Sequence, residues 1–299
     1  MDRIVEVLKN KCCIFVGAGI PKNLGFPLWS ELACHLVQVL WNIRDDLKKE
    51  KFDQNIQKEL EEEINKGNCI RAITYCETLL KENELRDVFI KEIVTIFGDD
   101  SKCVAIKNNP IYIELFKFVE NSFFIQTNID QSIELFKDIQ CFLNDSLPQD
   151  TYSQQLPFLV YLHGIVTRPE TWIFTRKEYV DSYQKNSGLS SFLQSVFKNY
   201  NVIFLGYSLS DREILDNLAK GADNGKKYYL VMEEIERDKW KNKIWETDLN
   251  NYGISVVKYD VSNEESSEAF LKFLKKINSF HIPKIDTKKP KESDRKKIQ

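Results

Sequence analysis

The chain has 299 residues, with 42 Lys and Arg against 45 Asp and Glu, which gives a formal net charge of −3. Its 19 Phe and 12 Tyr exclude a wholly disordered chain, and the balanced charge argues against a nucleic-acid partner held through its phosphates. Apolar runs such as residues 12–20 are shorter than the roughly 18 residues that span a bilayer. No apolar signal segment follows the N-terminus, so we expect a cytoplasmic protein without membrane association.

The cysteines favour the same compartment. There are seven, an odd number, and no two of them have C-x-x-C spacing. Cys12 and Cys13 are adjacent within an apolar run. This usage is typical of reduced, buried thiols rather than a disulfide framework or a zinc site. We therefore predict that the protein binds no metal.

Six short apolar segments recur along the chain, separated by stretches with helical character. They are residues 12–17, 123–127, 158–162, 201–205, 227–232 and 254–259. Each is almost continuously apolar, as strands buried on both faces are. The sequence therefore predicts an α/β fold with a doubly wound, mainly parallel, Rossmann-like sheet.

The segment from about 28 to 118 has a different pattern. Residues 28–43 place leucines at helical spacing, residues 44–66 are dominated by charge, and residues 70–82 and 85–97 are also helical in pattern. We predict a helical module inserted between the first two strands of one domain, residues 1–280. Residues 281–299 are rich in Lys and Arg, which is typical of a basic flexible tail or a linker.

Small residues follow two of the predicted strands, where an open parallel sheet binds its ligands. Gly17, Ala18 and Gly19 come directly after the first strand, and their backbone amides suit a pyrophosphate. Gly206 and Ser208 form a second small-residue turn after the fourth predicted strand, suited to phosphate or ribose. Glu233, or its neighbour Glu234, follows the fifth, where a carboxylate can accept hydrogen bonds from ribose hydroxyls.

Polar side chains that can take part in catalysis follow the second and third predicted strands. Asn128 and Asp130 come just after the second predicted strand, and such groups are costly to bury without partners. One alternative remains open, in which either residue caps a helix over 131–138. His163 ends the third strand, and imidazole is the usual general base near neutral pH. These strand ends together predict a dinucleotide site with Asn128 and His163 as its reactive groups.

Four motifs in this order resemble the sirtuin family over roughly residues 10–262. Residues 17–20 (GAGI) resemble the G-A-G-I-S turn, and residues 126–130 (QTNID) are similar to the T-Q-N-I-D motif with its first two residues exchanged. Residues 163–164 (HG) resemble the catalytic H-G, and residues 206–209 (GYSL) the G-T-S-L turn. The resemblance implies a Rossmann-like fold that takes NAD⁺ as a substrate.

Differences from the deacylating sirtuins indicate which group of the family this sequence resembles. The four-Cys zinc module is absent, and residues 25–29 (GFPLW) stand where those enzymes carry G-I-P-D-F-R. The G-x-P-x-W form and the helical module resemble the sirtuin-like domains of bacterial anti-phage systems, such as the NADase domain of the Thoeris effector. By that resemblance Asn128 and His163 are the catalytic pair, and Asp130 binds the carboxamide of NAD⁺.

The resemblance implies an NAD⁺ glycohydrolase that releases nicotinamide and ADP-ribose and depletes NAD⁺ in abortive anti-phage defence. Two alternatives remain, an NAD⁺-dependent protein deacylase and a non-catalytic sensor subunit that binds NAD⁺ or ADP-ribose. A constitutive NAD⁺ hydrolase would harm its own cell, so we expect a gated activity. We expect a homo-oligomer, with a partner ATPase or a phage-derived or nucleotide activator as the gate.

Overall fold

The computed structural model describes residues 2–49, 52–99, 102, 105–136, 139–151, 154–209, 211–222, 225–234, 239–262 and 265–281. Apart from residue 281, the predicted basic tail (residues 281–299) therefore lies outside the described residues. Within them, no helix has the length and apolar character needed to cross a bilayer.

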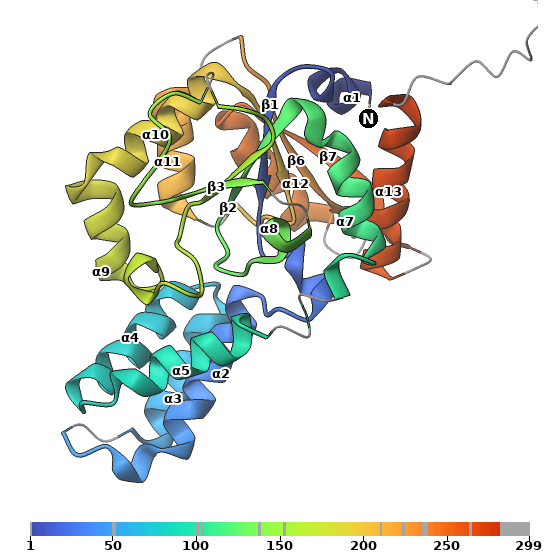
Figure 1. The fold of residues 1–299 in the computed structure, drawn as a ribbon. Coiled ribbons are helices and arrows are strands. Elements are labelled where there is room, and N and C mark those ends of the chain that lie inside the picture. Colours follow the sequence, from blue (N-terminus) through green and yellow to red (C-terminus); the bar gives the residue numbers. More distant parts are fainter. Residues whose placement is uncertain are drawn as a thin grey trace, which may run out of the picture.

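A seven-stranded parallel sheet forms the centre of the protein (Figure 1). The strands are β1 (Cys12–Val16), β2 (Ser122–Gln126), β3 (Gln140–Leu143), β4 (Phe158–Tyr161), β5 (Asn201–Leu205), β6 (Tyr228–Glu234) and β7 (Ile254–Asp260). Their order is β3-β4-β2-β1-β5-β6-β7, and every neighbouring pair is parallel. This architecture confirms the predicted α/β fold, and it adds β3, which the sequence did not predict.

Helices cover both faces of the sheet. Cys12, Ile14 and Val16 of β1 point into a core shared with α1 (Asp2–Leu8), α7 (Pro110–Leu115) and α13 (Ser266–His281). Cys13 and Phe15 point into a second core with α10 (Ser187–Asn199), α11 (Arg212–Gly221) and α12 (Lys239–Asn251). Because side chains alternate along a strand, a continuous apolar run such as β1 supplies both cores at once.

The strand order reverses at β1, which pairs with β2 on one side and with β5 on the other. Connections leaving the two sides of such a point diverge and open a crevice at the carboxyl ends of the strands. Here the turns after β1 and β5 touch, because Gly17 N donates to Leu205 O at 3.0 Å and Gly19 N to Gly206 O at 2.8 Å. The base of the crevice is therefore built from two glycine turns.

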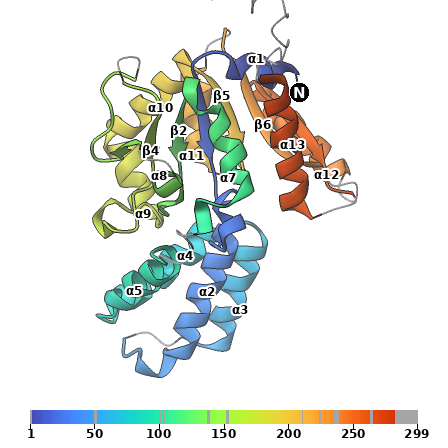
Figure 2. The same ribbon diagram turned by 45° about the vertical axis from the view of Figure 1, so that its right-hand side comes forward.

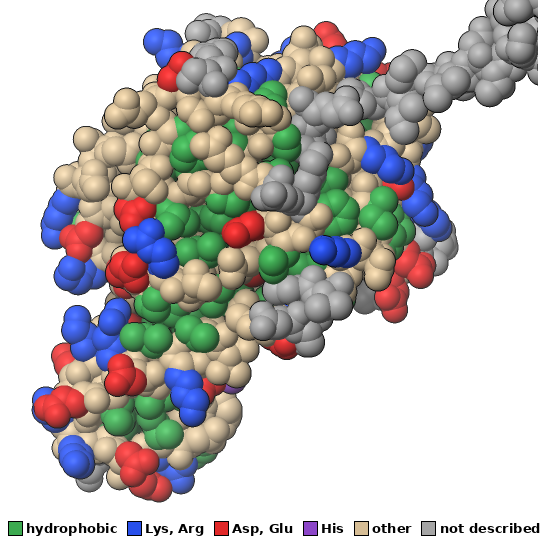
Figure 3. All heavy atoms as spheres, viewed as in Figure 1, with side chains coloured by type: hydrophobic (Ala, Val, Ile, Leu, Met, Phe, Trp, Pro, Cys, Tyr) green, Lys and Arg blue, Asp and Glu red, His purple; other side chains and the backbone are tan. Residues whose placement is uncertain are grey.

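The helical module lies beyond the carboxyl ends of the strands (Figures 1 and 2). It comprises α2 (Trp29–Asn42), α3 (Gln54–Asn65), α4 (Cys69–Glu82) and α5 (Arg86–Phe97), and Figure 3 shows it as a lobe projecting from the body of the sheet. The helix α7, which falls in the predicted interval 28–118, packs instead against α13. It thus belongs with the helices that cover the sheet.

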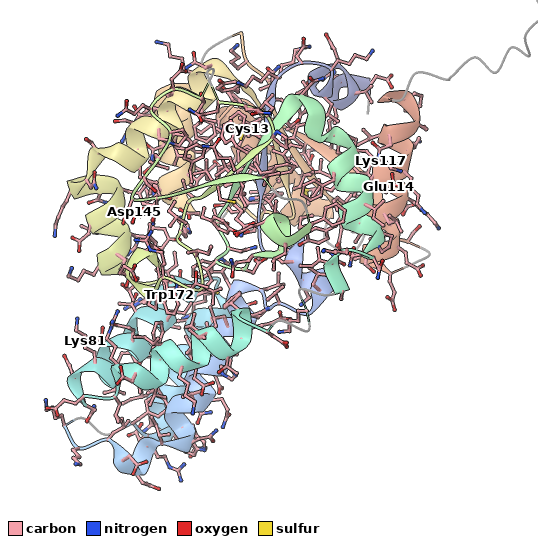
Figure 4. All side chains as sticks on the ribbon, viewed as in Figure 1. Cys13, Lys81, Glu114, Lys117, Asp145 and Trp172 are labelled. Atoms are coloured by element: carbon pink, nitrogen blue, oxygen red, sulfur yellow. The ribbon has the colours of Figure 1, made fainter. Side chains whose placement is uncertain are left out.

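Aromatic rings join the module to the segment that follows β4. The ring of Phe174 lies 5.4 Å from that of Trp29 on α2 and 6.4 Å from that of Phe89 on α5. Its neighbour Trp172 is at this junction (Figure 4) and packs on Phe174 with centroids 5.7 Å apart. The module is therefore anchored to the same segment of chain that begins at His163.

We expect Gly206→Ala to destabilise the protein much more than Gly67→Ala does. Both glycines have positive φ, 58° and 86° respectively, a region that costs other residues about 1 kcal/mol. A Cβ on Gly206 would lie 2.7 Å from Ile20 N, whereas one on Gly67 would have no atom within 4 Å. Urea denaturation should give a loss of about 1 kcal/mol for Gly67→Ala and about 3 kcal/mol for Gly206→Ala. Equal losses would refute a close approach of the two turns.

Candidate functional site

A pocket of about 1030 Å³ opens at the carboxyl ends of the strands. This volume is at the upper end of the range for ligand pockets, about 300–1,000 Å³. Its walls include residues that follow β1, β2, β4 and β5, residues at the ends of β6 and β7, and residues of the module such as Trp29 and Ile70. The pocket thus occupies the crevice that the strand order creates, with the module along one side.

The pocket brings together six of the residues predicted from sequence: Ala18, Gly19, His163, Gly206, Ser208 and Glu233. The other three, Gly17, Asn128 and Asp130, lie outside its lining. Gly17 instead packs against the second glycine turn, where an added Cβ would lie 2.5 Å from Gly206 O. Its lack of a side chain lets the two turns meet beneath the pocket.

The segments that carry Asn128 and His163 run side by side. Leu162 N donates to Gln126 O at 2.9 Å, and Val166 N donates to Ile129 O at 2.9 Å. These two bonds extend the pairing of β2 with β4 beyond the ends of both strands. Asn128 and His163 therefore lie on adjacent connections, although the sequence separates them by 35 positions.

The alternative role of helix capping applies to Asp130. Its Oδ1 accepts a hydrogen bond from Ser132 N at 3.0 Å, at the start of α8 (Ser132–Phe136). Its Oδ2 is buried without a partner, and burial raises the pKa of this carboxyl above its usual 3.8. The Asn128 Nδ2 is likewise buried without a partner, while the Gln126 side chain holds the turn by donating to Asn128 O at 2.9 Å.

His163 is buried and uncharged. Its side chain is only 1% exposed, and burial lowers the imidazole pKa from 6.5 to about 3. The Nε2 atom lies 2.8 Å from the hydroxyl oxygen of Tyr183, while Nδ1 has no partner. In the neutral tautomer that carries its hydrogen on Nε2, the Tyr183 oxygen accepts that hydrogen. This tautomer leaves the lone pair of Nδ1 available as a proton acceptor.

Asp211 is a buried neighbour of His163 that the sequence analysis did not select. Its Oδ2 lies 3.8 Å from His163 Nε2 and accepts a hydrogen bond from the Tyr179 hydroxyl at 3.1 Å. Burial, together with the charge of Glu213, raises the pKa of Asp211 from 3.8 to about 7. The His163–Asp211 distance is within ion-pair range, but burial shifts both groups toward their uncharged forms.

Unpartnered polar atoms gather around this pocket. Within the part of the chain that the structure describes, the buried side-chain atoms without a hydrogen-bond partner include Thr127 Oγ1, Asn128 Nδ2, Asp130 Oδ2, His163 Nδ1 and Asp211 Oδ1. Each such atom costs about 1–3 kcal/mol, and native structures hold few of them. Their concentration after β2, β4 and β5, within one stretch of the sheet, marks a site built to bond a polar ligand. The described residues contain no group of three or more His, Cys, Asp or Glu that could hold a metal.

Polar side chains also line the far end of the pocket, beyond β6. Glu233 accepts hydrogen bonds from Tyr259, at 3.5 Å between the two oxygens, and from Ser266. Lys22, next to the first glycine turn, lines the pocket and forms an ion pair with Glu31 of α2. The pocket thus has a carboxylate at one end and an ammonium group beside the glycine turns.

Residues 122–257 match the SIR2-like domain family. The match begins at β2 and extends into β7, so it includes Asn128, His163 and Asp211 but not the glycine turn after β1. No curated protein matches the chain. The family match confirms the resemblance to sirtuins that the sequence motifs indicated.

Proposed function

Because residues 122–257 form a sirtuin-like domain, a kind of domain that uses NAD⁺, we propose that the protein is an NAD⁺ glycohydrolase. It cleaves the bond between nicotinamide and ribose with water as the acceptor. The observation that carries this proposal is the neutral His163, which lines the pocket and whose Nδ1 is buried without a partner. A buried proton acceptor in the wall of the pocket suits the activation of water at a ribose carbon, and the adjacent connection carries Asn128.

The proposed reaction consumes one water and releases one proton. The C1′–N bond breaks, and its electron pair goes to the nicotinamide nitrogen, which neutralises the pyridinium charge. Water adds to C1′ of the oxocarbenium-like ribose, and His163 Nδ1 accepts the proton and passes it to solvent. Proton transfer of this kind contributes about 100- to 10,000-fold in rate. By the sirtuin resemblance, Asn128 holds the ribose and orients the water. Because Asn128 lies outside the pocket lining, this role requires its buried side chain to reach the pocket when NAD⁺ binds.

The remaining residues bind the dinucleotide. Ala18 and Gly19 line the pocket, and we place the pyrophosphate against this turn. The Gly19 amide itself is bonded to Gly206 O, and Gly17 packs against the second glycine turn. Ser208 and Glu233 provide a hydroxyl and a carboxylate for the adenosine end. By the sirtuin resemblance, Asp130, which lies outside the pocket lining, would bind the carboxamide of the nicotinamide through its unpartnered Oδ2. The lining residues thus fit NAD⁺ as a substrate, and the proposed chemistry uses no metal.

We further propose that this activity depletes NAD⁺ in the cytoplasm as a defence against phage infection. An unregulated NAD⁺ hydrolase would kill its host, so the activity must be gated. We propose that the gate is assembly into a homo-oligomer, a partner ATPase, or a phage-derived or nucleotide activator.

Incubation of the protein with NAD⁺, with and without an acetyl-lysine peptide, tests the proposed reaction. A hydrolase uses water as the acceptor, so nicotinamide should appear at the same rate in both reactions. Nicotinamide release that requires the peptide would instead establish a deacylase. Binding of NAD⁺ without nicotinamide release in either reaction would favour a sensor subunit and would contradict the proposal.

A further inference from the structure

Beyond the pair implied by the family motifs, the carboxyl group of Asp211 faces the catalytic histidine. We propose that Asp211 is a positioning residue, which stabilises the imidazolium formed when Nδ1 of His163 accepts a proton. The inference rests on the proposed hydrolase for its chemistry, while its geometry stands independently.

The placement of Asp211 has three parts. Its Oδ2 is 3.8 Å from His163 Nε2, on the side of the ring opposite to the free Nδ1. The same oxygen accepts the Tyr179 hydroxyl at 3.1 Å, and the Tyr179 ring packs edge-on against the imidazole with centroids 5.2 Å apart. Oδ1 is buried without a hydrogen-bond partner. The carboxyl group of Asp211 thus lies next to the imidazole, and its Oδ1 accepts no hydrogen bond.

The other titratable groups around Asp211 come from three elements. Glu213, on α11, raises the pKa of Asp211 by its charge and pairs with Arg176 at 3.5 Å. Tyr179 and Tyr183, from the helical segment that begins at Arg176, have pKa values raised by burial and by Asp211. Tyr207, in the turn before α11, has its pKa raised for the same reasons. All three phenols stay neutral near pH 7. Among these neighbours, it is therefore the charge of Glu213 that acts on the pKa of Asp211.

The proton balance explains why the reaction needs this carboxyl group. A histidine whose pKa is about 3 is a weak acceptor for a proton from water. When Nδ1 takes that proton, the ring carries a positive charge in a buried site. A carboxylate 3.8 Å from Nε2 favours that charge, so Asp211 makes the transfer easier through the histidine. The proton leaves for solvent after the nicotinamide has gone.

Nuclear magnetic resonance of ¹⁵N-histidine-labelled protein tests this coupling without any assay of turnover. The chain has only three histidines, so the His163 ring nitrogens can be followed individually. In the wild type, their shifts should change with a midpoint near pH 7 as Asp211 titrates. Asp211→Asn should abolish that change. The control Asp216→Asn removes a half-exposed carboxyl of the same helix and should leave it intact.

Tyr179→Phe provides a second variant that keeps the carboxyl group. The Tyr179 hydroxyl stabilises the charged form of Asp211, so its removal should move the midpoint seen at His163 to higher pH. An unchanged midpoint in Tyr179→Phe would overturn the inference. So would a pH 7 transition at His163 that persists in Asp211→Asn.

Turnover provides the second readout. Asp211→Asn should lower kcat for NAD⁺ by about 10- to 100-fold, as the loss of a supporting partner commonly does, without raising KM. Wild-type turnover in Asp211→Asn would overturn the positioning role. If the wild type itself released no nicotinamide, the proposed function would fail, and the ¹⁵N titration would still decide whether Asp211 is coupled to His163.

Discussion

Replacement of Asn128 or His163 by alanine should reduce NAD⁺ consumption by about 100- to 10,000-fold while the fold remains intact. His163→Ala removes the proton acceptor whose Nδ1 is free in the structure. Asn128→Ala removes an amide whose Nδ2 is buried without a partner, so its loss should cost the folded state little. The measurement is NAD⁺ consumption per folded molecule, with the folded fraction taken from thermal melts.

Matched controls separate chemistry from stability in this experiment. His35→Ala removes a histidine of the module that bonds Glu92 at 2.8 Å, and Asn144→Ala removes an amide that bonds Thr171 O at 2.7 Å. Both controls should retain turnover per folded molecule, even where stability falls. Because Asn128 and His163 act on one step, the double variant should lose little more activity than the less active of the two single variants. Normal turnover in either single variant would remove that residue from the mechanism.

Asp211→Asn should make the stability of the folded protein rise with pH below neutrality, where the wild type changes little. In the wild type the raised pKa of Asp211 means that the folded state loses stability as pH rises from 3.8 to about 7. The lowered pKa of His163 means that the folded state loses stability as pH falls from 6.5 to about 3. The two effects oppose each other between pH 4 and 6.5, so the pair should contribute a nearly flat profile.

The variant keeps only the effect of His163. The free energy of unfolding of the variant, relative to that of the wild type, should therefore increase as pH rises from about 4 to 8. The raised pKa of Asp211 in the wild type sets the size of this increase, up to about 4 kcal/mol. Urea denaturation at several pH values measures the difference. Asp216→Asn, on the same helix, should follow the wild type at every pH. A constant difference between Asp211→Asn and the wild type would show that Asp211 is ionised normally in the folded protein.

The sheet was predictable because burial on both faces leaves an almost continuous apolar run. All six runs that the sequence contains form strands, and they lie in one parallel sheet. The strand β3 was missed because it lies at the edge of the sheet, where Gln140 is exposed and the next three residues are half-buried. An edge strand of four residues carries too little apolar pattern to separate it from a loop.

The site was predictable only where a residue's place followed from a strand end. Ala18, Gly19, His163, Gly206, Ser208 and Glu233 directly follow or end strands, and they line one pocket. Asp211 was missed because its importance comes from burial against Tyr179, which lies 32 positions earlier in the chain. Only the fold brings them together, although the turn at residues 206–211 already placed a carboxyl group near the strand end.

Hydrolysis of NAD⁺ in ¹⁸O-labelled water tests the central claim most directly. If a proton acceptor at His163 activates water, the protein should release nicotinamide and ADP-ribose in equal amounts, with one ¹⁸O atom at C1′ of the ADP-ribose. His163→Ala should form neither product above background. Nicotinamide release without ¹⁸O at C1′ would show that another acceptor takes the ribose and would contradict the account.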